Sequence, residues 1–191
     1  MKKCISPNDA YQIRTNLKGR NIVFVGMMGS GKSAIGKRLA ANLDLPFMDA
    51  DNEIEAAAGM SIPDIFDCFG EDHFRQGERK VIARLMGEGP MVLSTGGGAF
   101  MNDETRELIT SNAISIWLKA DIETLVQRVK RKDNRPLLKT GDPEEIMSNL
   151  LKEREPFYSL ANVVVESRND SHESVVEAVA ESLLAEMHSE A

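Results

Sequence analysis

The residues best suited to chemistry form one glycine-rich stretch, GMMGSGKS at residues 26–33. Glycine lets backbone N–H groups close around phosphate oxygens, because a Cβ atom would obstruct the torsions and the close approach that this needs. Lys32 supplies a positive charge for the β- and γ-phosphates of a nucleotide, and the Ser33 hydroxyl is a ligand for Mg²⁺. The stretch predicts a P-loop that binds a nucleoside triphosphate. An ordinary glycine-rich turn before a helix is the alternative.

The segments on either side of this stretch have the order that a P-loop needs. An apolar run at residues 22–25 predicts a strand before it. After it, Ile35, Leu39 and Leu43 recur every four residues, as on one face of a helix. The N-terminus of that helix would direct its partial positive charge at the same phosphates.

Two carboxylates follow the next predicted strand, which covers residues 45–48. Asp49 and Asp51 stand where the strand ends, and in a parallel α/β sheet ligands collect at the carboxyl ends of the strands. Both acids would therefore face the phosphates, where Mg²⁺ and an acceptor hydroxyl must lie. The alternative is helix capping, with Asp51 or Asn52 beginning the helix predicted at residues 53–58. Taken alone, such a pair more often serves as a cap.

The remaining pattern alternates strands with helices. Strands are predicted at residues 91–94, 112–118 and 163–166. Helices are predicted at residues 61–69, 71–86 after a break at Gly70, 103–110, 122–130, 143–158 and 172–187. Such alternation implies right-handed crossovers and a parallel sheet that is covered on both faces. We see no internal repeat and no second domain.

Two further positions are candidates for substrate contacts. Three glycines at residues 96–98 follow a predicted strand, where they predict a backbone donor site or a close approach to a ligand. A plain turn is an equally good interpretation. Arg75 lies on a predicted helix beside Glu78 and Arg79, and spacing alone does not distinguish a binding residue from a helical ion pair.

Basic residues concentrate in one segment of this acidic chain, whose formal net charge is −7. A local basic patch attracts anions despite the overall charge. Proline and glycine near the patch suggest a loop that folds over the nucleotide as a lid. A solvated charged surface is the usual alternative, but a P-loop in the same chain favours the lid. The basic residues are Arg128, Lys130, Arg131, Lys132, Arg135 and Lys139.

Composition limits the class of protein. The chain has 191 residues, of which 42% are hydrophobic and 28% charged, as expected for one globular domain. The net negative charge argues against a non-specific nucleic-acid binder. With Cys4 and Cys68 as the only cysteines and no metal-like spacing, we expect a cytoplasmic protein. Residues 1–20 lack the apolar core of a signal peptide, and we predict that they form a mobile extension or a helix packed on the surface. No apolar stretch in the sequence is long enough to span a membrane.

Taken together, these motifs resemble the shikimate kinase family over about residues 20–187. The resemblance rests on GMMGSGKS, FMDADNEIE, SIPDIFDCFGEDHFRQGE, STGGG, RPLL at residues 135–138 and REPFY at residues 154–158. It implies an α/β, three-layer P-loop NTPase fold related to nucleoside monophosphate kinases, with a five-stranded parallel sheet flanked by helices. Residues 1–20 would be an N-terminal extension and 21–188 a single kinase domain, with substrate-binding helices at about 52–86 and a lid at about 131–142.

The same resemblance implies transfer of the ATP γ-phosphate to the 3-hydroxyl of shikimate, a step of chorismate and aromatic amino acid biosynthesis. The residues implied to bind ATP are Gly29, Ser30, Gly31, Lys32, Ser33, Ala34, Arg128 beside adenine and Arg135 over the phosphates. Those implied to bind shikimate are Asp51, Arg75, Gly97 and Arg154, with Glu78 orienting its neighbours. Mg²⁺ would be bound by Ser33, and by Asp49 through water. Lys32, Asp51 and Arg135 would be the catalytic residues.

One segment departs from the family pattern. The resemblance implies that SRNDSH at residues 167–172 holds the adenine face opposite Arg128, but the segment has no proline and Arg168 is its basic candidate. His172 suits a helix-capping turn. We expect a monomer that binds neither nucleic acid nor membranes. Two other functions remain open: a kinase of the same fold for gluconate or a nucleoside monophosphate, and a nucleotide-binding module that dispenses with Asp51.

Overall fold

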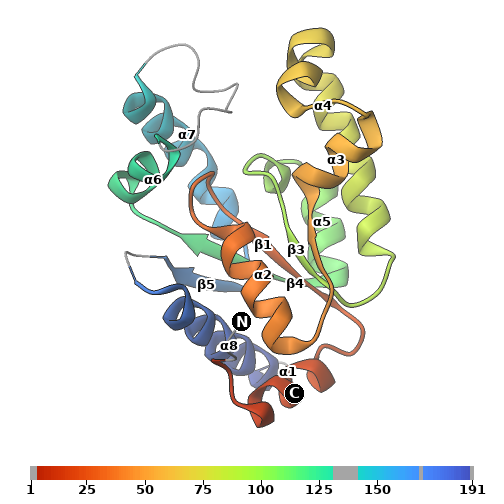
Figure 1. Ribbon diagram of the computed structural model, residues 1–191, viewed down its shortest axis with the longest axis vertical. Helices are drawn as coiled ribbons and strands as arrows, with labels where there is room; N and C mark the ends of the chain where they lie inside the picture. Colours follow the sequence, from red (N-terminus) through yellow and green to blue (C-terminus); the bar gives the residue numbers. More distant parts are fainter. Residues whose placement is uncertain (1–3, 131–141, 168–169, 190–191) are drawn as a thin grey trace.

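Five parallel strands form a single sheet at the centre of the molecule (Figure 1). The computed structural model describes residues 4–130, 142–167 and 170–189. The strand order is β2-β3-β1-β4-β5, and each neighbouring pair is parallel. The strands are β1 (Asn21–Val25), β2 (Phe47–Asp49), β3 (Val92–Ser94), β4 (Ala113–Lys119) and β5 (Val163–Glu166). The predicted α/β architecture is confirmed.

Helices cover both faces of this sheet, and β1 shows why its sequence is apolar throughout. Ile22 and Phe24 belong to a core shared with α1, α2 and α8, whereas Val23 and Val25 belong to a core shared with α4, α5 and α7. A strand buried on both faces needs apolar residues at successive positions. The helices are α1 (Pro7–Asn16), α2 (Lys32–Leu43), α3 (Ala50–Ala58), α4 (Ile62–Met86), α5 (Asp103–Asn112), α6 (Ile122–Val129), α7 (Pro143–Tyr158) and α8 (His172–Ser189), with a 3-10 turn η1 at Ala99–Met101.

The first helix packs onto the domain. Ile13 and Leu17 are buried in the core that α1 shares with α2 and α8, and α1 lies beside α8 (Figure 1). The side-chain oxygen of Asn42 on α2 accepts hydrogen bonds from the backbone N–H groups of Cys4 (2.8 Å) and Ile5 (3.1 Å). Of the two alternatives for the N-terminal segment, the packed helix is therefore the one that forms.

The long helix α4 contains the predicted break. Gly70 has φ 80° and ψ 174°, so the helix is interrupted there even though it continues on both sides. A side chain at this φ would be strained, which explains why glycine marks the division. The two parts of α4 and the short α3 rise on one side of the strand ends, and α6 and α7 on the other (Figure 1).

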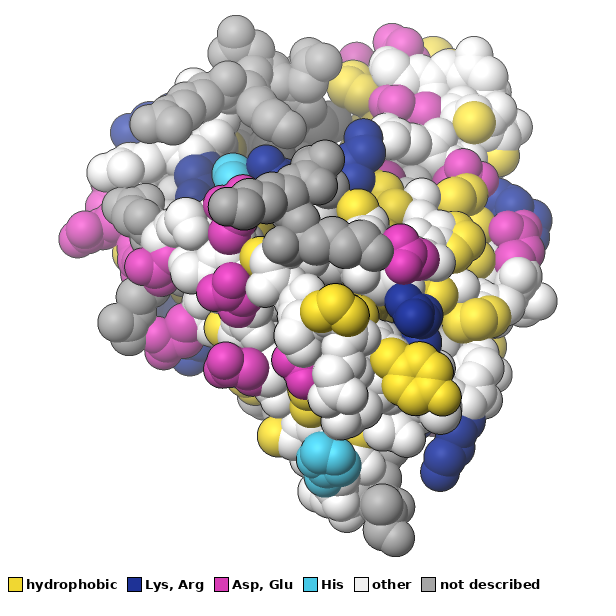
Figure 2. Space-filling model, turned by 60° about the horizontal axis from the view of Figure 1, so that its bottom comes forward, with side chains coloured by type: hydrophobic (Ala, Val, Ile, Leu, Met, Phe, Trp, Pro, Cys, Tyr) yellow, Lys and Arg dark blue, Asp and Glu magenta, His cyan; other side chains and the backbone are white. Residues whose placement is uncertain are grey.

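The surface carries both signs of charge. On the face in Figure 2, acidic and basic side chains are interspersed, and the described residues form no broad basic area there. Within the described ranges, no helix combines the length and the apolar character that a membrane span requires.

Candidate active site

The glycine-rich stretch forms a tight loop between β1 and α2. Residues 26, 29 and 31 all have positive φ, at 128°, 83° and 103°. A Cβ atom on Gly29 would also lie 2.9 Å from Cγ2 of Val129 and 3.2 Å from the backbone oxygen of Leu125. Both the torsion and the lack of space require glycine at this position. The loop leads directly into α2, which begins at Lys32, so the predicted strand, loop and helix are all present.

Lys32 lies under the loop. Its side chain is buried, and its Nζ donates to the backbone oxygens of Gly26 (2.8 Å) and Met27 (3.0 Å). These carbonyls stabilise an ammonium group that has lost most of its contact with water. The positive charge is thereby held at the loop and at the N-terminus of α2, where an anion would bind.

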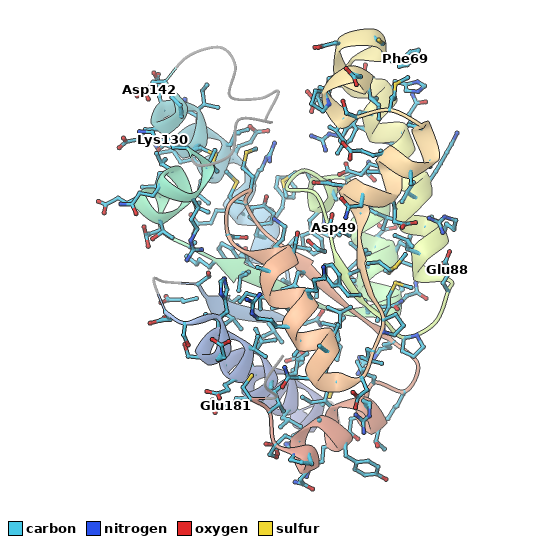
Figure 3. All side chains as sticks on the ribbon, in the orientation of Figure 1. Asp49, Phe69, Glu88, Lys130, Asp142 and Glu181 are labelled. Atoms are coloured by element: carbon cyan, nitrogen blue, oxygen red, sulfur yellow. The ribbon has the colours of Figure 1, made fainter. Side chains whose placement is uncertain are left out.

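Ser33 and Asp49 lie together at the ends of neighbouring elements. The Ser33 hydroxyl donates to Oδ2 of Asp49 at 2.5 Å and lies 3.2 Å from the hydroxyl of Ser94. Asp49 ends β2 and pairs in register with Ser94 of β3. Figure 3 shows Asp49 beside α2. Hydroxyl and carboxylate oxygens are the protein ligands that Mg²⁺ prefers. This pair therefore fits a magnesium ion that takes its other ligands from phosphates and water.

Helix capping at this position uses a different residue from the predicted one. Oδ1 of Asp49 accepts from the backbone N–H of Asp51 at 3.1 Å, so Asp49 is the N-cap of α3. The prediction that Asp51 or Asn52 begins the helix is wrong. A cap must stand outside the helix with extended torsions, and Asp49 at the end of a strand already has them. Its other oxygen, Oδ2, accepts from Ser33 at the start of α2, so capping does not prevent the contact with that helix.

Arg75 lies on α4 between acidic partners and a glycine backbone. Its guanidinium donates to Glu78 (2.8 Å) and to Glu71 (2.9 and 3.2 Å). A Cβ atom on Gly98 would lie 2.5 Å from Nη1 of Arg75. The helical ion pair considered from the sequence is present, but Arg75 also packs directly against the loop of residues 96–98. That contact joins distant segments, so helical spacing did not indicate it.

Glu78 is a buried carboxylate beside this loop. Its side chain is 3% exposed, and among the described residues its Oε1 has no hydrogen-bond partner. A Cβ atom on Gly96 would lie 2.6 Å from that oxygen and 3.1 Å from Oδ1 of Asp51. Burial raises the pKa of Glu78 above its ordinary value, the positive charge of Arg75 opposes that rise, and the negative charge of Asp51 adds to it.

The raised pKa of Glu78 gives a testable dependence of stability on pH. Because the folded state binds this proton more tightly than the unfolded chain, the stabilising contribution is complete below the ordinary value of 4.5 and is lost as the pH rises through the folded-state pKa. Glutamine cannot ionise. We therefore expect the melting temperature of Glu78→Gln minus that of the parent to increase from about pH 4 to about pH 8.

Thermal melts of Glu78→Gln and Glu71→Gln across this pH range would check that expectation. Glu71 pairs with the same guanidinium, but its side chain is 53% exposed. Exposed ion pairs contribute little to stability, so the Glu71 variant should follow the parent at each pH. A difference for Glu78→Gln that shrinks or stays constant with rising pH would contradict the buried-carboxylate interpretation.

Arg154 and Gly97 meet on the other side of the loop. Arg154 on α7 is buried, and its Nη1 would lie 3.3 Å from a Cβ atom on Gly97. Among the described residues, its Nε has no hydrogen-bond partner. Four residues later on α7, the hydroxyl of Tyr158 donates to the backbone oxygen of Gly97 at 2.5 Å. Sequence reasoning missed Tyr158, although its i, i+4 spacing from Arg154 places both on one side of the helix.

Arg128 on α6 lies against the P-loop. Its Nη1 donates to the backbone oxygen of Ser30 (3.2 Å), to that of Gly29 (3.4 Å) and to the hydroxyl of Ser167 (3.1 Å). Ser167 begins the segment expected to face adenine, and Arg128 brings this one residue together with the P-loop. Two sets of predicted residues lie outside the part of the chain that the structure describes: the lid residues within 131–141, which include Arg135, and Arg168.

Comparison with known proteins gives one consistent result. The family model for shikimate kinase matches residues 28–186. The chain is 57% identical over 183 residues to the shikimate kinase of Bradyrhizobium diazoefficiens, covering 96% of this chain and 88% of that protein. Its identity to the shikimate kinase of Caulobacter vibrioides is 56% over 163 residues, covering 85% of this chain and 82% of that protein.

Solved structures agree with the sequence comparison. The shikimate kinase from Acinetobacter baumannii, solved in complex with shikimate, superposes with a TM-score of 0.86 at 35% identity, covering 91% of this chain and 97% of that one. A gluconokinase from Sinorhizobium meliloti has a TM-score of 0.58 at 19% identity over 91% of this chain and 94% of that one, which indicates a shared fold only. The predicted P-loop kinase fold is confirmed, and the chain belongs to the shikimate kinase family.

Proposed function

We propose that the residues around the loop of residues 96–98 and the P-loop together carry out the shikimate kinase reaction. The chain is an ATP-dependent kinase that transfers the γ-phosphate to the 3-hydroxyl of shikimate, giving shikimate 3-phosphate and ADP. One observation above all supports the proposed site. Two arginines from different helices, Arg75 and Arg154, approach the same glycine loop, which itself lies against the P-loop.

The proposed shikimate-binding residues are matched to the charge of the substrate. Shikimate carries one carboxylate, and Arg75 and Arg154 would bind it through charge-assisted hydrogen bonds. Gly97 would complete the contact, because a residue without a side chain leaves room for the ring beside Arg154. Glu78 would keep the guanidinium of Arg75 oriented through the 2.8 Å bond between them.

Catalysis in this site would depend on alignment and on charge neutralisation, because phosphoryl transfer needs no covalent enzyme intermediate. Asp51 would accept a hydrogen bond from the 3-hydroxyl and take its proton late in the transfer. Lys32 would neutralise charge on the transferring phosphoryl group. The position of Asp51 beside Gly96, at the start of the glycine loop, supports its role.

Residues 29–34 would bind the ATP phosphates through their backbone N–H groups and the Lys32 side chain. Arg128 is proposed to lie beside adenine, which its contacts with the P-loop and Ser167 support. Arg135 is proposed from its motif alone to reach the phosphates as a lid residue.

Mg²⁺ is the proposed cofactor. Ser33 would bind it directly and Asp49 through water, as their 2.5 Å contact supports. Magnesium commonly takes only one or two protein ligands beside phosphate oxygens and water. When bound, the ion neutralises charge on the β- and γ-phosphates. The expectations that the protein is cytoplasmic and monomeric stay predictions.

Acceptor-dependent ADP formation tests the proposed function. Purified protein with ATP and Mg²⁺ would be given shikimate, gluconate or a panel of nucleoside monophosphates. We expect rapid ADP formation with shikimate alone. Turnover with gluconate or a nucleotide instead would assign another kinase of this fold, and tight ATP binding without ADP formation would indicate a non-catalytic nucleotide-binding module.

A further inference from the structure

We infer that Tyr158 is a positioning residue whose hydroxyl holds the substrate loop of residues 96–98 in register with the P-loop. The inference rests on the proposed function, because it takes Gly97 as part of the shikimate site. Because its side chain is fully buried, we place Tyr158 outside direct contact with either substrate. It acts through the backbone of Gly97, and its hydroxyl is also hydrogen-bonded to Arg154.

The hydroxyl of Tyr158 reaches both loops at once. It donates to the backbone oxygen of Gly97 at 2.5 Å, and its oxygen lies 3.8 Å from the sulfur of Met27. Met27 is the P-loop residue whose own backbone oxygen accepts from Lys32. One side chain at the end of α7 therefore contacts the loop that would bind the acceptor and the loop that would bind the donor.

The environment of Tyr158 keeps its hydroxyl a donor with a fixed direction. The side chain is fully buried and packs 5.9 Å, centroid to centroid, from the ring of Trp117. Burial raises the pKa of Tyr158 to about 12, so the phenol stays protonated at any pH at which the enzyme would work. Because the ring is buried and packed beside Trp117, the core limits the direction in which the hydroxyl can donate.

Fixing the carbonyl of Gly97 fixes the peptide group that follows it. In a planar trans peptide the C=O of one residue and the N–H of the next point in opposite directions. The bond from Tyr158 therefore turns the N–H of Gly98 away from α7. The guanidinium of Arg75 lies against Gly98, and that of Arg154 against Gly97. Rotation of this peptide would therefore change how the backbone packs against both guanidinium groups.

The first test is Tyr158→Phe, which removes one oxygen and keeps the ring. We expect KM for shikimate to rise about five- to tenfold, because the loss of one buried hydrogen bond would destabilise the shikimate complex by about that factor in affinity. KM for ATP and the affinity for ADP should change less than about twofold, because the P-loop keeps its own backbone contacts. Steady-state kinetics with each substrate varied, and calorimetry with ADP, give both quantities.

Ser115→Ala is the matched control. The Ser115 hydroxyl is also buried and donates to Asn162 at 2.7 Å, in the middle of β4 and outside the site. Its loss should lower the melting temperature by roughly 2–4 °C without changing either KM. An equal rise in KM for shikimate in both variants, or none in Tyr158→Phe, would overturn the inference. If the parent itself failed to bind shikimate, the proposed function would fail instead.

A measurement on the parent chain serves if Tyr158→Phe does not fold. The chain contains two tyrosines, and Tyr11 on α1 is 62% exposed. In protein labelled with 3-fluorotyrosine, the ¹⁹F resonance of Tyr158 should shift when shikimate is added, while that of Tyr11 stays as an internal reference. A Tyr158 resonance that does not respond to saturating shikimate would overturn the inference.

Discussion

The Lys32→Met variant is expected to fold and to lose almost all phosphoryl transfer, by about a thousandfold or more in kcat. A loss of that size corresponds to roughly 4 kcal/mol of transition-state stabilisation. Methionine keeps an unbranched apolar stem, and the Nζ of Lys32 donates to the backbone oxygens of Gly26 and Met27. The variant therefore removes the positive charge under the P-loop with little change in packing.

ADP release and circular dichroism would measure activity and folding in this variant. Lys37→Met is the matched control, because Lys37 lies on the same helix α2 and its side chain is exposed. We expect the control to keep parental kcat. Near-normal turnover in Lys32→Met, with the fold intact, would refute the assignment of the P-loop as the phosphate site.

The second large effect is expected in Arg75→Ala and Arg154→Ala. Removing one partner of a desolvated charged hydrogen bond typically costs about 2 to 5 kcal/mol, or roughly thirtyfold to several-thousandfold in affinity. We expect each variant to weaken shikimate binding by at least the lower factor and to leave ATP binding to the free enzyme almost unchanged. Calorimetric titration with shikimate and with ATP measures both.

Two controls separate charge recognition from general damage. Arg79 lies one turn from Arg75 on α4, and its contact with Glu104 is long, at 3.8 Å; Arg79→Ala should bind shikimate as the parent does. A shikimate analogue with a neutral amide in place of the carboxylate should bind the parent poorly and lose less in either arginine variant. Parental affinity for shikimate in both arginine variants, or equal binding of amide and acid, would contradict the carboxylate clamp.

The arginine variants should differ in stability. Arg75→Ala leaves Glu78 buried without its cationic partner, and an uncompensated buried carboxylate is costly. The charge of Arg154 lowers the pKa of Glu78 less than that of Arg75 does, so the loss of Arg154 leaves this carboxylate with its main cationic partner. Binding should therefore be compared at a temperature at which both variants remain folded.

Local pattern was enough to predict most of the fold. The bounds predicted for α7 and β5 are those observed, because a proline at the first turn of α7 and an apolar run in β5 are strong local signals. The P-loop was equally clear, since its glycines, lysine and serine are contiguous. These features depend on residues close together in the sequence.

What the sequence did not predict depends on distant contacts. The ion pair of Arg75 with Glu78 follows from helical spacing, but the packing of Arg75 on Gly98 joins α4 to the loop after β3. Sequence reasoning gave Tyr158 no role of its own, because the contact of its hydroxyl with Gly97 joins α7 to a distant loop. In the same way, Asp49 and Asp51 both stand at the junction of a strand and a helix, and only the observed end of β2 shows that Asp49 caps α3 and that Asp51 lies in its first turn.

The position of the phosphate in the product tests the proposed site most directly. The protein would be incubated with ATP, Mg²⁺ and shikimate, and the product examined by ¹H–³¹P correlation spectroscopy. The arrangement of Arg75, Arg154 and Asp51 predicts a single phosphorylated product whose phosphorus is coupled to the proton on carbon 3. Phosphate on another hydroxyl, a mixture of positions, or ADP formation that does not depend on shikimate would contradict it.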